Sequence, residues 1–178
     1  MEQKSQDKSQ DKPKLILPPK LIHVEGPIIF LGGPIQGAKN WQETAIELIH
    51  SLAPQITIAS PRRDKKFKGD IVEYNNQVDW ETTYLRIAAQ HGAILFWLAM
   101  ESEHIPGRAY AQTSRFELGE WKERHARDGT KLIVGIESGF SNEKYIKRRF
   151  HQDCPGVPIF STLEETCQRA VKRVLEKS

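Results

Sequence analysis

The sequence has few cysteines, no long hydrophobic run and no large excess of either charge. Its two cysteines, Cys154 and Cys167, are too few for a disulfide framework or a four-ligand zinc site. The longest apolar run, residues 92–100, is about half of the ~20 residues that a membrane-spanning helix needs. No hydrophobic signal core follows the N-terminus, so we expect a cytoplasmic protein with no membrane partner. The 26 Lys and Arg against 23 Asp and Glu leave a net charge of +3, which does not indicate a nucleic-acid polymer as partner.

Residues 1–20 have the composition of a tail. The segment repeats Lys-Ser-Gln-Asp and has no large apolar residue between Met1 and Leu15, so it cannot bury enough surface to offset its ordering entropy. We predict disorder to about Lys14 and then an extended strip bounded by prolines. The remaining residues, 21–178, are predicted to form one domain, because 178 residues correspond to roughly one domain.

Short apolar runs alternate with amphipathic helical segments through the rest of the chain. The predicted strands are residues 27–31, 55–59, 93–98, 131–136 and 157–160, and the predicted helices start near 40, 78, 113, 142 and 161. Continuous apolar strands joined by helices indicate a parallel sheet covered on both faces. The fold class that we predict is therefore α/β, a flavodoxin-like, doubly wound, five-stranded parallel sheet of order 2-1-3-4-5. Ligands bind such sheets outside the carboxyl ends of the strands, here between strands one and three.

The loop after the first strand contains Gly32, Gly33, Pro34, Ile35 and Gln36. Its glycines allow backbone N–H groups to approach a ligand, and the helix that follows favours an anionic or oxygen-rich group. The loop is neither a Walker loop nor a dinucleotide fingerprint, because it matches neither spacing. A tight turn without any ligand is an equally good interpretation of these residues.

Glu117 is predicted to lie in the first turn of the helix beside the switch point. An ordinary Glu there is ionised at neutral pH and stabilised by the helix dipole, so it is available as a nucleophile. The competing interpretation is structural, because Ser114-x-x-Glu117 has the spacing of a capping box, as do Asn40 with Glu43 and Ser161 with Glu164. From these residues alone, the cap is the better interpretation.

Other polar residues also follow the strands. Asp79 and Glu81 open the helix after the long loop, where acids usually act as dipole partners. Two carboxylates that converge from different helices would instead suit glycosyl transfer. Arg62 could reach a phosphate or carboxylate, and Trp97 could stack on a base, although a buried aromatic needs no such role.

Taken together, these segments resemble the nucleoside 2-deoxyribosyltransferase-like family over about residues 27–137. The resemblance rests on an ordered set of segments, none of them specific alone: FLGGPI from Phe30, SPRR from Ser60, Trp80-Glu81 with Leu85, Ile94 to Trp97, FELG from Phe116, and VGIE from Val134. It reverses the preference at Glu117, which it implies to be the nucleophile that attacks C1′ of the sugar.

The resemblance also implies roles for other residues. Glu81 stands where the family has an acid, usually Asp, that contacts or protonates the base, and the Gly33-Pro34 turn would place backbone groups against sugar and base. Candidates to contact the 5′ group are Arg62, Arg108 and Thr113. The classical enzymes have an acid, and the related nucleotide hydrolases a serine, six residues before the nucleophile, where this chain has Ala111. A homo-oligomer, dimeric or larger, is implied because a neighbouring subunit commonly completes the pocket.

The expected activity is that of a transferase or hydrolase that acts on the N-glycosidic bond of a nucleoside or nucleotide, without cofactor or metal. Two alternatives stay open at this point. The same residues could form a non-catalytic nucleotide-sensing module, or Glu117 could assist cleavage of the nicotinamide–ribose bond of NAD.

Overall fold

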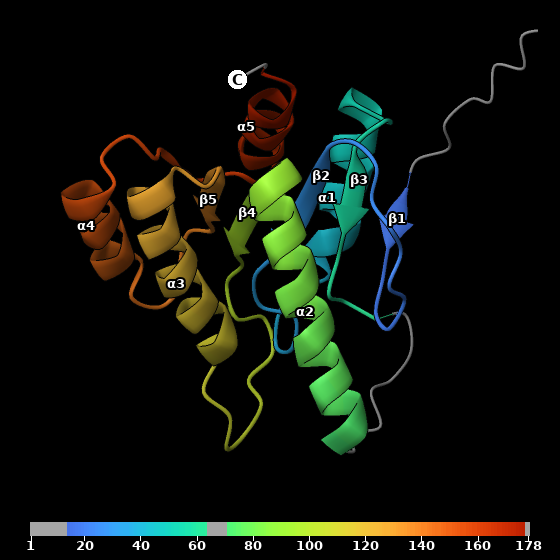
Figure 1. The fold of residues 1–178 in the computed structure, drawn as a ribbon. Helices are drawn as coiled ribbons and strands as arrows, with labels where there is room; N and C mark the ends of the chain where they lie inside the picture. Colours follow the sequence, from blue (N-terminus) through green and yellow to red (C-terminus); the bar gives the residue numbers. More distant parts are fainter. Residues whose placement is uncertain (1–13, 64–70, 177–178) are drawn as a thin grey trace, which may run out of the picture.

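The computed structural model describes residues 14–63 and 71–176. Its strands and helices alternate along the chain, apart from β1 and β2, which are consecutive (Figure 1). The strands are β1 (Leu15–Ile16), β2 (Ile28–Gly32), β3 (Thr57–Ala59), β4 (Gly92–Leu98), β5 (Leu132–Ile136) and β6 (Ile159–Phe160). The helices are α1 (Trp41–Leu52), α2 (Ile71–His91), α3 (Gln112–Asp128), α4 (Glu143–Asp153) and α5 (Leu163–Leu175).

All neighbouring strands of the sheet are parallel, in the order β1-β3-β2-β4-β5-β6. The five strands from β2 to β6 confirm the predicted doubly wound order. The prediction of five strands was one short, because Leu15 and Ile16, within the segment predicted to be a tail, pair with Ile58 and Ala59 of β3. Ile16 is buried there, so β3 is not the edge of the sheet.

Helices cover both faces of the sheet. On one face, α2, α3 and α4 pack on β-strand residues that include Phe30, Phe96 and Val134. On the other face, α1 and α5 lie side by side on residues that include Leu31 and Leu95. Alternate residues of the same strands thus enter two cores, which is why the strands are continuously apolar.

The segment between β1 and β2 is fixed on α2 by two buried aromatic residues. The indole N–H of Trp80 donates to the Lys20 carbonyl oxygen at 2.8 Å. The Ile22 N–H donates to the hydroxyl of Tyr84 at 2.7 Å, and that hydroxyl lies 3.1 Å from the Ile22 carbonyl oxygen. Trp80 and Tyr84 also pack on each other, with ring centroids 4.6 Å apart. These contacts fix the position of α2, which carries Glu81.

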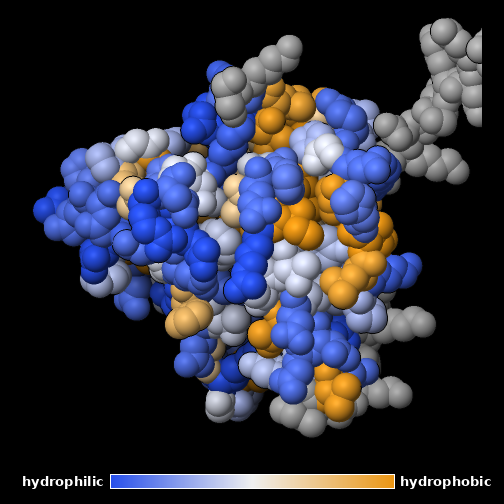
Figure 2. Space-filling view, in the orientation of Figure 1, coloured by the Kyte–Doolittle hydropathy of each residue, from blue (hydrophilic) through white to orange (hydrophobic). Residues whose placement is uncertain are grey.

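Helix α2 begins at Ile71, seven residues before its predicted start, and its amino-terminal part extends past the carboxyl edge of the sheet (Figure 1). Val78 is 41% exposed, because this part of α2 has no sheet beneath it. Hydrophobic residues show at this end of α2, which includes Val72, and over the segment beside it that holds Leu21 and Ile22 (Figure 2).

The predicted helix caps are confirmed in one case and displaced by one residue in another. Asn40 caps α1 and accepts a hydrogen bond from the Glu43 N–H, as the capping box predicts. The cap of α5 is Thr162 with Glu165 instead of Ser161 with Glu164. The two pairs have the same spacing, but it is the Thr162 hydroxyl that accepts a hydrogen bond from the Glu165 N–H. In the part of the chain that the structure describes, no helix is long and apolar enough to cross a membrane.

We expect Tyr84→Phe to lower the free energy of unfolding by about 0.5–1.5 kcal/mol, because it removes the hydroxyl that accepts the part-buried hydrogen bond from the Ile22 N–H. Urea denaturation followed by circular dichroism measures this change. The matched control is Tyr145→Phe, because Tyr145 is 64% exposed, and a surface substitution changes stability by less than about 0.5 kcal/mol. Equal effects of the two substitutions would contradict the role given to Tyr84.

Candidate active site

The candidate site lies at the carboxyl edge of the sheet, where helices α2 and α3 cover the same face. Glu81 projects from α2 and Glu117 from α3, and both residues are half-buried. The two carboxyl groups are close enough that the charge of Glu81 acts on Glu117. The structure therefore brings together the two acids that the sequence singled out from segments 36 residues apart.

Glu117 is not part of a helix cap. The capping residue of α3 is Ala111, in the left-handed conformation with a φ of 56° and with no side-chain hydrogen bond to the helix. Ser114 lies inside the helix and is buried, so the capping-box interpretation is wrong. The sequence predicted Glu117 in the first turn of α3, but the residue lies in the second turn. The helix dipole therefore stabilises its charge less than it would in the first turn.

Burial raises the pKa of Glu117. Its carboxyl group is largely removed from water, and this desolvation, together with the charges of Glu81 and Glu120, raises its pKa to about 8. The expectation of an ionised Glu117 at neutral pH is therefore wrong. The reason is tertiary, because burial of the carboxyl group is the main cause of the raised pKa and the carboxylate that α2 brings beside it adds to the effect.

Glu81 has a different environment. Burial raises its pKa as well, but a hydrogen bond from Gln77 and the charge of Arg63 oppose that effect. The Gln77 amide nitrogen lies 2.6 Å from Oε1 of Glu81. Glu81 is thus the acid of the pair that has partners for its ionised form, and Gln77 is a residue that sequence reasoning missed. The sequence feature that could have identified Gln77 is its spacing of four residues from Glu81, which places both side chains on one face of the helix.

The loop between β2 and α1, which holds the predicted glycine turn, leaves the sheet at the same carboxyl edge. A Cβ at Gly33, whose φ is 143°, would lie 2.2 Å from the Trp97 carbonyl oxygen, so only glycine fits there. The carbonyl of Pro34 accepts a hydrogen bond of 2.8 Å from the indole N–H of Trp41. The turn is therefore rigid, and Gly32, Gly33 and Pro34 are all buried.

Arg62 holds this same loop. Its Nε donates to the Gln42 side-chain oxygen at 2.8 Å, and its terminal nitrogen donates to the Ile35 carbonyl at 3.0 Å. The guanidinium group, which follows β3, thus holds the loop by a hydrogen bond to its backbone. If Arg62 contacts an anion, it must do so through guanidinium N–H groups that are not used in these two hydrogen bonds.

A second loop, between β4 and α3, closes over the first. The carbonyl of Gly37 accepts hydrogen bonds from the backbone N–H groups of Ser102 and Glu103, at 2.8 Å and 3.1 Å. The exposed side chains of Gln36 and Arg108 hydrogen-bond to each other. The candidates Gln36 and Arg108 are therefore adjacent, on the rim formed by the two loops.

Two of the three remaining candidates, Asp79 and Trp97, lie outside this arrangement. Asp79 is exposed, on a face of α2 that turns away from Glu81. Thr113 is exposed in the first turn of α3, four residues before Glu117 and on the same side of that helix. Trp97 is 5% exposed and packs in the core on the α1 and α5 side, which confirms the structural interpretation of this residue.

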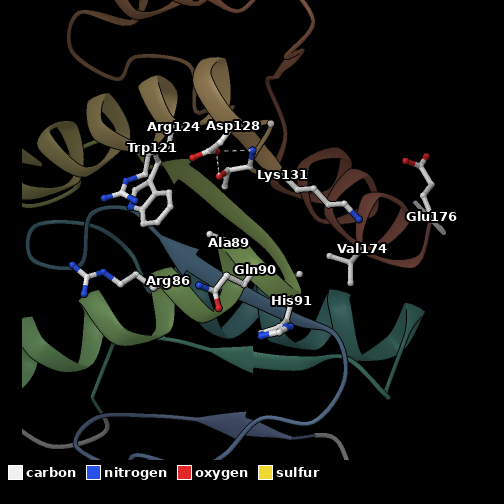
Figure 3. Close-up of a pocket in the computed structure, with 13 residues that line it drawn as sticks. Arg86, Ala89, Gln90, His91, Trp121, Arg124, Asp128, Lys131, Val174 and Glu176 are labelled. Atoms are coloured by element: carbon white, nitrogen blue, oxygen red, sulfur yellow. Dashed lines mark hydrogen bonds between the residues drawn. The ribbon is translucent and has the colours of Figure 1, made fainter.

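A separate cavity of about 570 Å³ lies at the opposite, amino-terminal edge of the sheet (Figure 3). Its lining includes Arg86, Arg124 and Lys131, near the carboxyl-terminal ends of α2 and α3 or directly after α3. Cations at such positions compensate the helix dipoles. The indole nitrogen of Trp121, which has no partner among the described residues, is itself covered and does not reach the cavity.

Comparison with known protein families identifies the family of this chain. A sequence model for the family described as nucleoside 2-deoxyribosyltransferase like matches residues 26–140, which is more than half of the chain. The matched range contains both acids and both loops of the candidate site. No curated protein matches the sequence.

We expect Glu117→Gln to stabilise the protein increasingly as the pH rises. An unfolded Glu titrates near ~4.3, whereas the folded group titrates at about 8, so the folded state holds more protons between these values. The free energy of unfolding therefore falls through this window in the wild type, and the neutral amide removes that fall. Thermal unfolding measured from about pH 5 to pH 8 should show a growing gain, about 2–4 °C for each kcal/mol.

The control for this prediction is Glu123→Gln, which changes an exposed carboxylate on the same helix. We expect no pH-dependent gain from it. A gain from Glu117→Gln that is the same at both ends of the pH range would contradict the raised pKa.

Proposed function

This chain belongs to the nucleoside 2-deoxyribosyltransferase-like family, and we propose that it breaks the N-glycosidic bond of a nucleoside or nucleotide. The (deoxy)ribosyl group would pass to another base or to water. The observation that carries this proposal is the pair of half-buried acids, Glu81 and Glu117, at the edge of the sheet where ligands bind. One acid holds a proton at neutral pH while the other has partners for its charge.

The proton balance of the reaction fits such a pair. An oxygen of Glu117 forms a bond to C1′, and the bond between C1′ and the base nitrogen breaks with its electron pair going to the base. The departing base needs one proton, and Glu117 must lose one to become the nucleophile. Glu81 would accept the proton from Glu117 and deliver it to the base, so that no proton is exchanged with bulk water.

The second half of the reaction reverses these transfers. A water molecule or an incoming base attacks C1′ of the glycosyl-enzyme, and its proton returns through Glu81 to Glu117. Microscopic reversibility allows one pair of acids to serve both steps. Whether transfer or hydrolysis prevails then depends on how well an acceptor base competes with water.

The surrounding residues support substrate placement in this proposal. The Gly33-Pro34 turn, held by Trp41, would place backbone groups against sugar and base, and Arg108, which hydrogen-bonds to Gln36 at the same edge of the sheet, could contact a 5′ group. The family implies that a neighbouring subunit completes the pocket, and the exposed end of α2 with Val72 and Val78 adjoins this edge. We therefore propose a homo-oligomer as the active form.

The experiment is to incubate the protein with deoxynucleosides, deoxynucleotides, ribonucleosides and NAD, with and without a second base, and to separate the free bases by chromatography. We expect release or exchange of base by the wild type and by Glu123→Gln, and its loss in Glu117→Gln. Full activity of Glu117→Gln would contradict the nucleophile. Silence across the panel from folded protein, with thermal stabilisation by a nucleotide, would favour the sensing module, and release of nicotinamide alone would favour NAD as substrate.

The shared proton also predicts the pH dependence of catalysis. We expect kcat/KM to fall above about pH 8, because the pair then loses the proton that the base needs. It should fall again at low pH, where both acids are protonated. Initial rates across the pH range, with folding checked at each pH by circular dichroism, measure this profile. A rate that stays constant well above pH 8 would contradict proton delivery by the pair.

A further inference from the structure

The side-chain amide of Gln77 joins the end of β3 to Glu81. Its nitrogen donates to Oε1 of Glu81 at 2.6 Å and to the Pro61 carbonyl oxygen at 3.1 Å. Its oxygen accepts a hydrogen bond of 2.6 Å from Nε of Arg63. Both amide hydrogens and the amide oxygen are thus in use, on three different partners.

These partners allow only one orientation of the amide. A carboxylate and a backbone carbonyl can only accept, and a guanidinium N–H can only donate. Turning the amide over would place its oxygen against two acceptors and its nitrogen against a donor. The same three partners therefore fix both the rotamer of Gln77 and the direction of its hydrogen bonds.

The placement of the residue follows from the fold. Gln77 and Glu81 are four residues apart and share one face of α2, which Trp80 and Tyr84 fix to the segment before β2. Pro61 and Arg63 leave the carboxyl end of β3. Arg63 also donates to the Glu73 carbonyl oxygen one turn earlier on α2, at 3.3 Å. The hydrogen bonds of Gln77 thus connect α2 to the segment that follows β3.

We propose that Gln77 is a positioning residue that holds the Glu81 carboxylate as an ionised hydrogen-bond acceptor and so leaves the shared proton on Glu117. This inference rests on the proposed function for its catalytic meaning. Gln77 acts through Glu81 and does not contact the reacting atoms.

The charges around the pair agree with this assignment. Arg63 and Gln77 act on Glu81 and favour its ionised form against the cost of burial. Among the residues that the structure describes, the charges that act on the buried Glu117 carboxyl are those of Glu81 and of Glu120, one turn along α3. A hydrogen bond to an ionised group is stronger than one between neutral groups, so the short contact from Gln77 helps to decide between two otherwise similar acids.

The kinetic test compares Gln77→Met with Gln90→Met, the same substitution at an exposed position near the other end of α2. Methionine keeps the length of the side chain but neither donates to Glu81 nor accepts from Arg63. We expect Gln77→Met to lower kcat by about 10–100-fold with KM changed less, part of the 10²–10⁴-fold that a positioned acid–base group contributes. Gln90→Met should match the wild type.

Two further variants separate positioning from a general loss of structure. Gln77→Glu keeps an acceptor for Arg63 but cannot donate to Glu81, so it should also lower kcat. In a Glu81→Gln background, Gln77→Met should add no further loss, because its effect passes through Glu81. An additive loss in that background, or full activity of Gln77→Glu, would overturn the proposal.

A measurement without turnover keeps this inference distinct from the proposed function. Carbon-13 NMR of protein labelled at the Glu carboxyl carbons follows each acid through a pH titration, with Glu81→Gln and Glu117→Gln providing the assignments. We expect Glu81 to ionise at lower pH than Glu117 in the wild type, and Gln77→Met to raise the Glu81 step. An unchanged Glu81 step would overturn the role of Gln77, whereas the absence of base release by the wild type would overturn only the enzymatic proposal.

Discussion

Two half-buried carboxyl groups lie near each other at one edge of the sheet, so that the negative charge of one disfavours ionisation of the other. Much of the surrounding structure holds them there. Glu81 and Glu117 come from α2 and α3, and ionising both would place like charges together away from water. Burial, followed by the charges of Glu81 and Glu120, raises the pKa of Glu117 to about 8. The partners of the two acids differ, because Gln77 and Arg63 act on Glu81, whereas the charges that act on Glu117 within the described residues are those of Glu81 and Glu120.

The surrounding structure holds the elements of the site in place. Trp80 and Tyr84 bind the segment after β1, and this prevents α2 from moving away from the sheet. On the other side, the indole of Trp41 and the guanidinium of Arg62 hold the turn after β2 through its carbonyl groups. Hydrogen bonds between side chains and backbone thus hold both α2, which carries Glu81, and the turn after β2 in place.

The order of the sheet was predictable from the sequence because five apolar runs separated by helices leave few right-handed topologies. Strand β1 was not, because Leu15 and Ile16 follow a polar repeat, and two apolar residues have no periodicity. Their pairing depends on β3, whose free edge becomes available only in the folded sheet. The start of α2 was misjudged for a similar reason, since the part of α2 that extends past the sheet carries no buried stripe.

The sequence by itself determined the glycine turn after β2, the helices that carry Glu81 and Glu117, and the edge of the sheet at which both acids lie. Each of these follows from local spacing or from the parallel topology. Only the tertiary structure decided that Ser114 is not a cap, that Glu117 holds a proton and that Gln77 supports Glu81. Those outcomes depend on burial and on contacts between α2, α3 and the end of β3, and such contacts exist only after the helices have packed on the sheet.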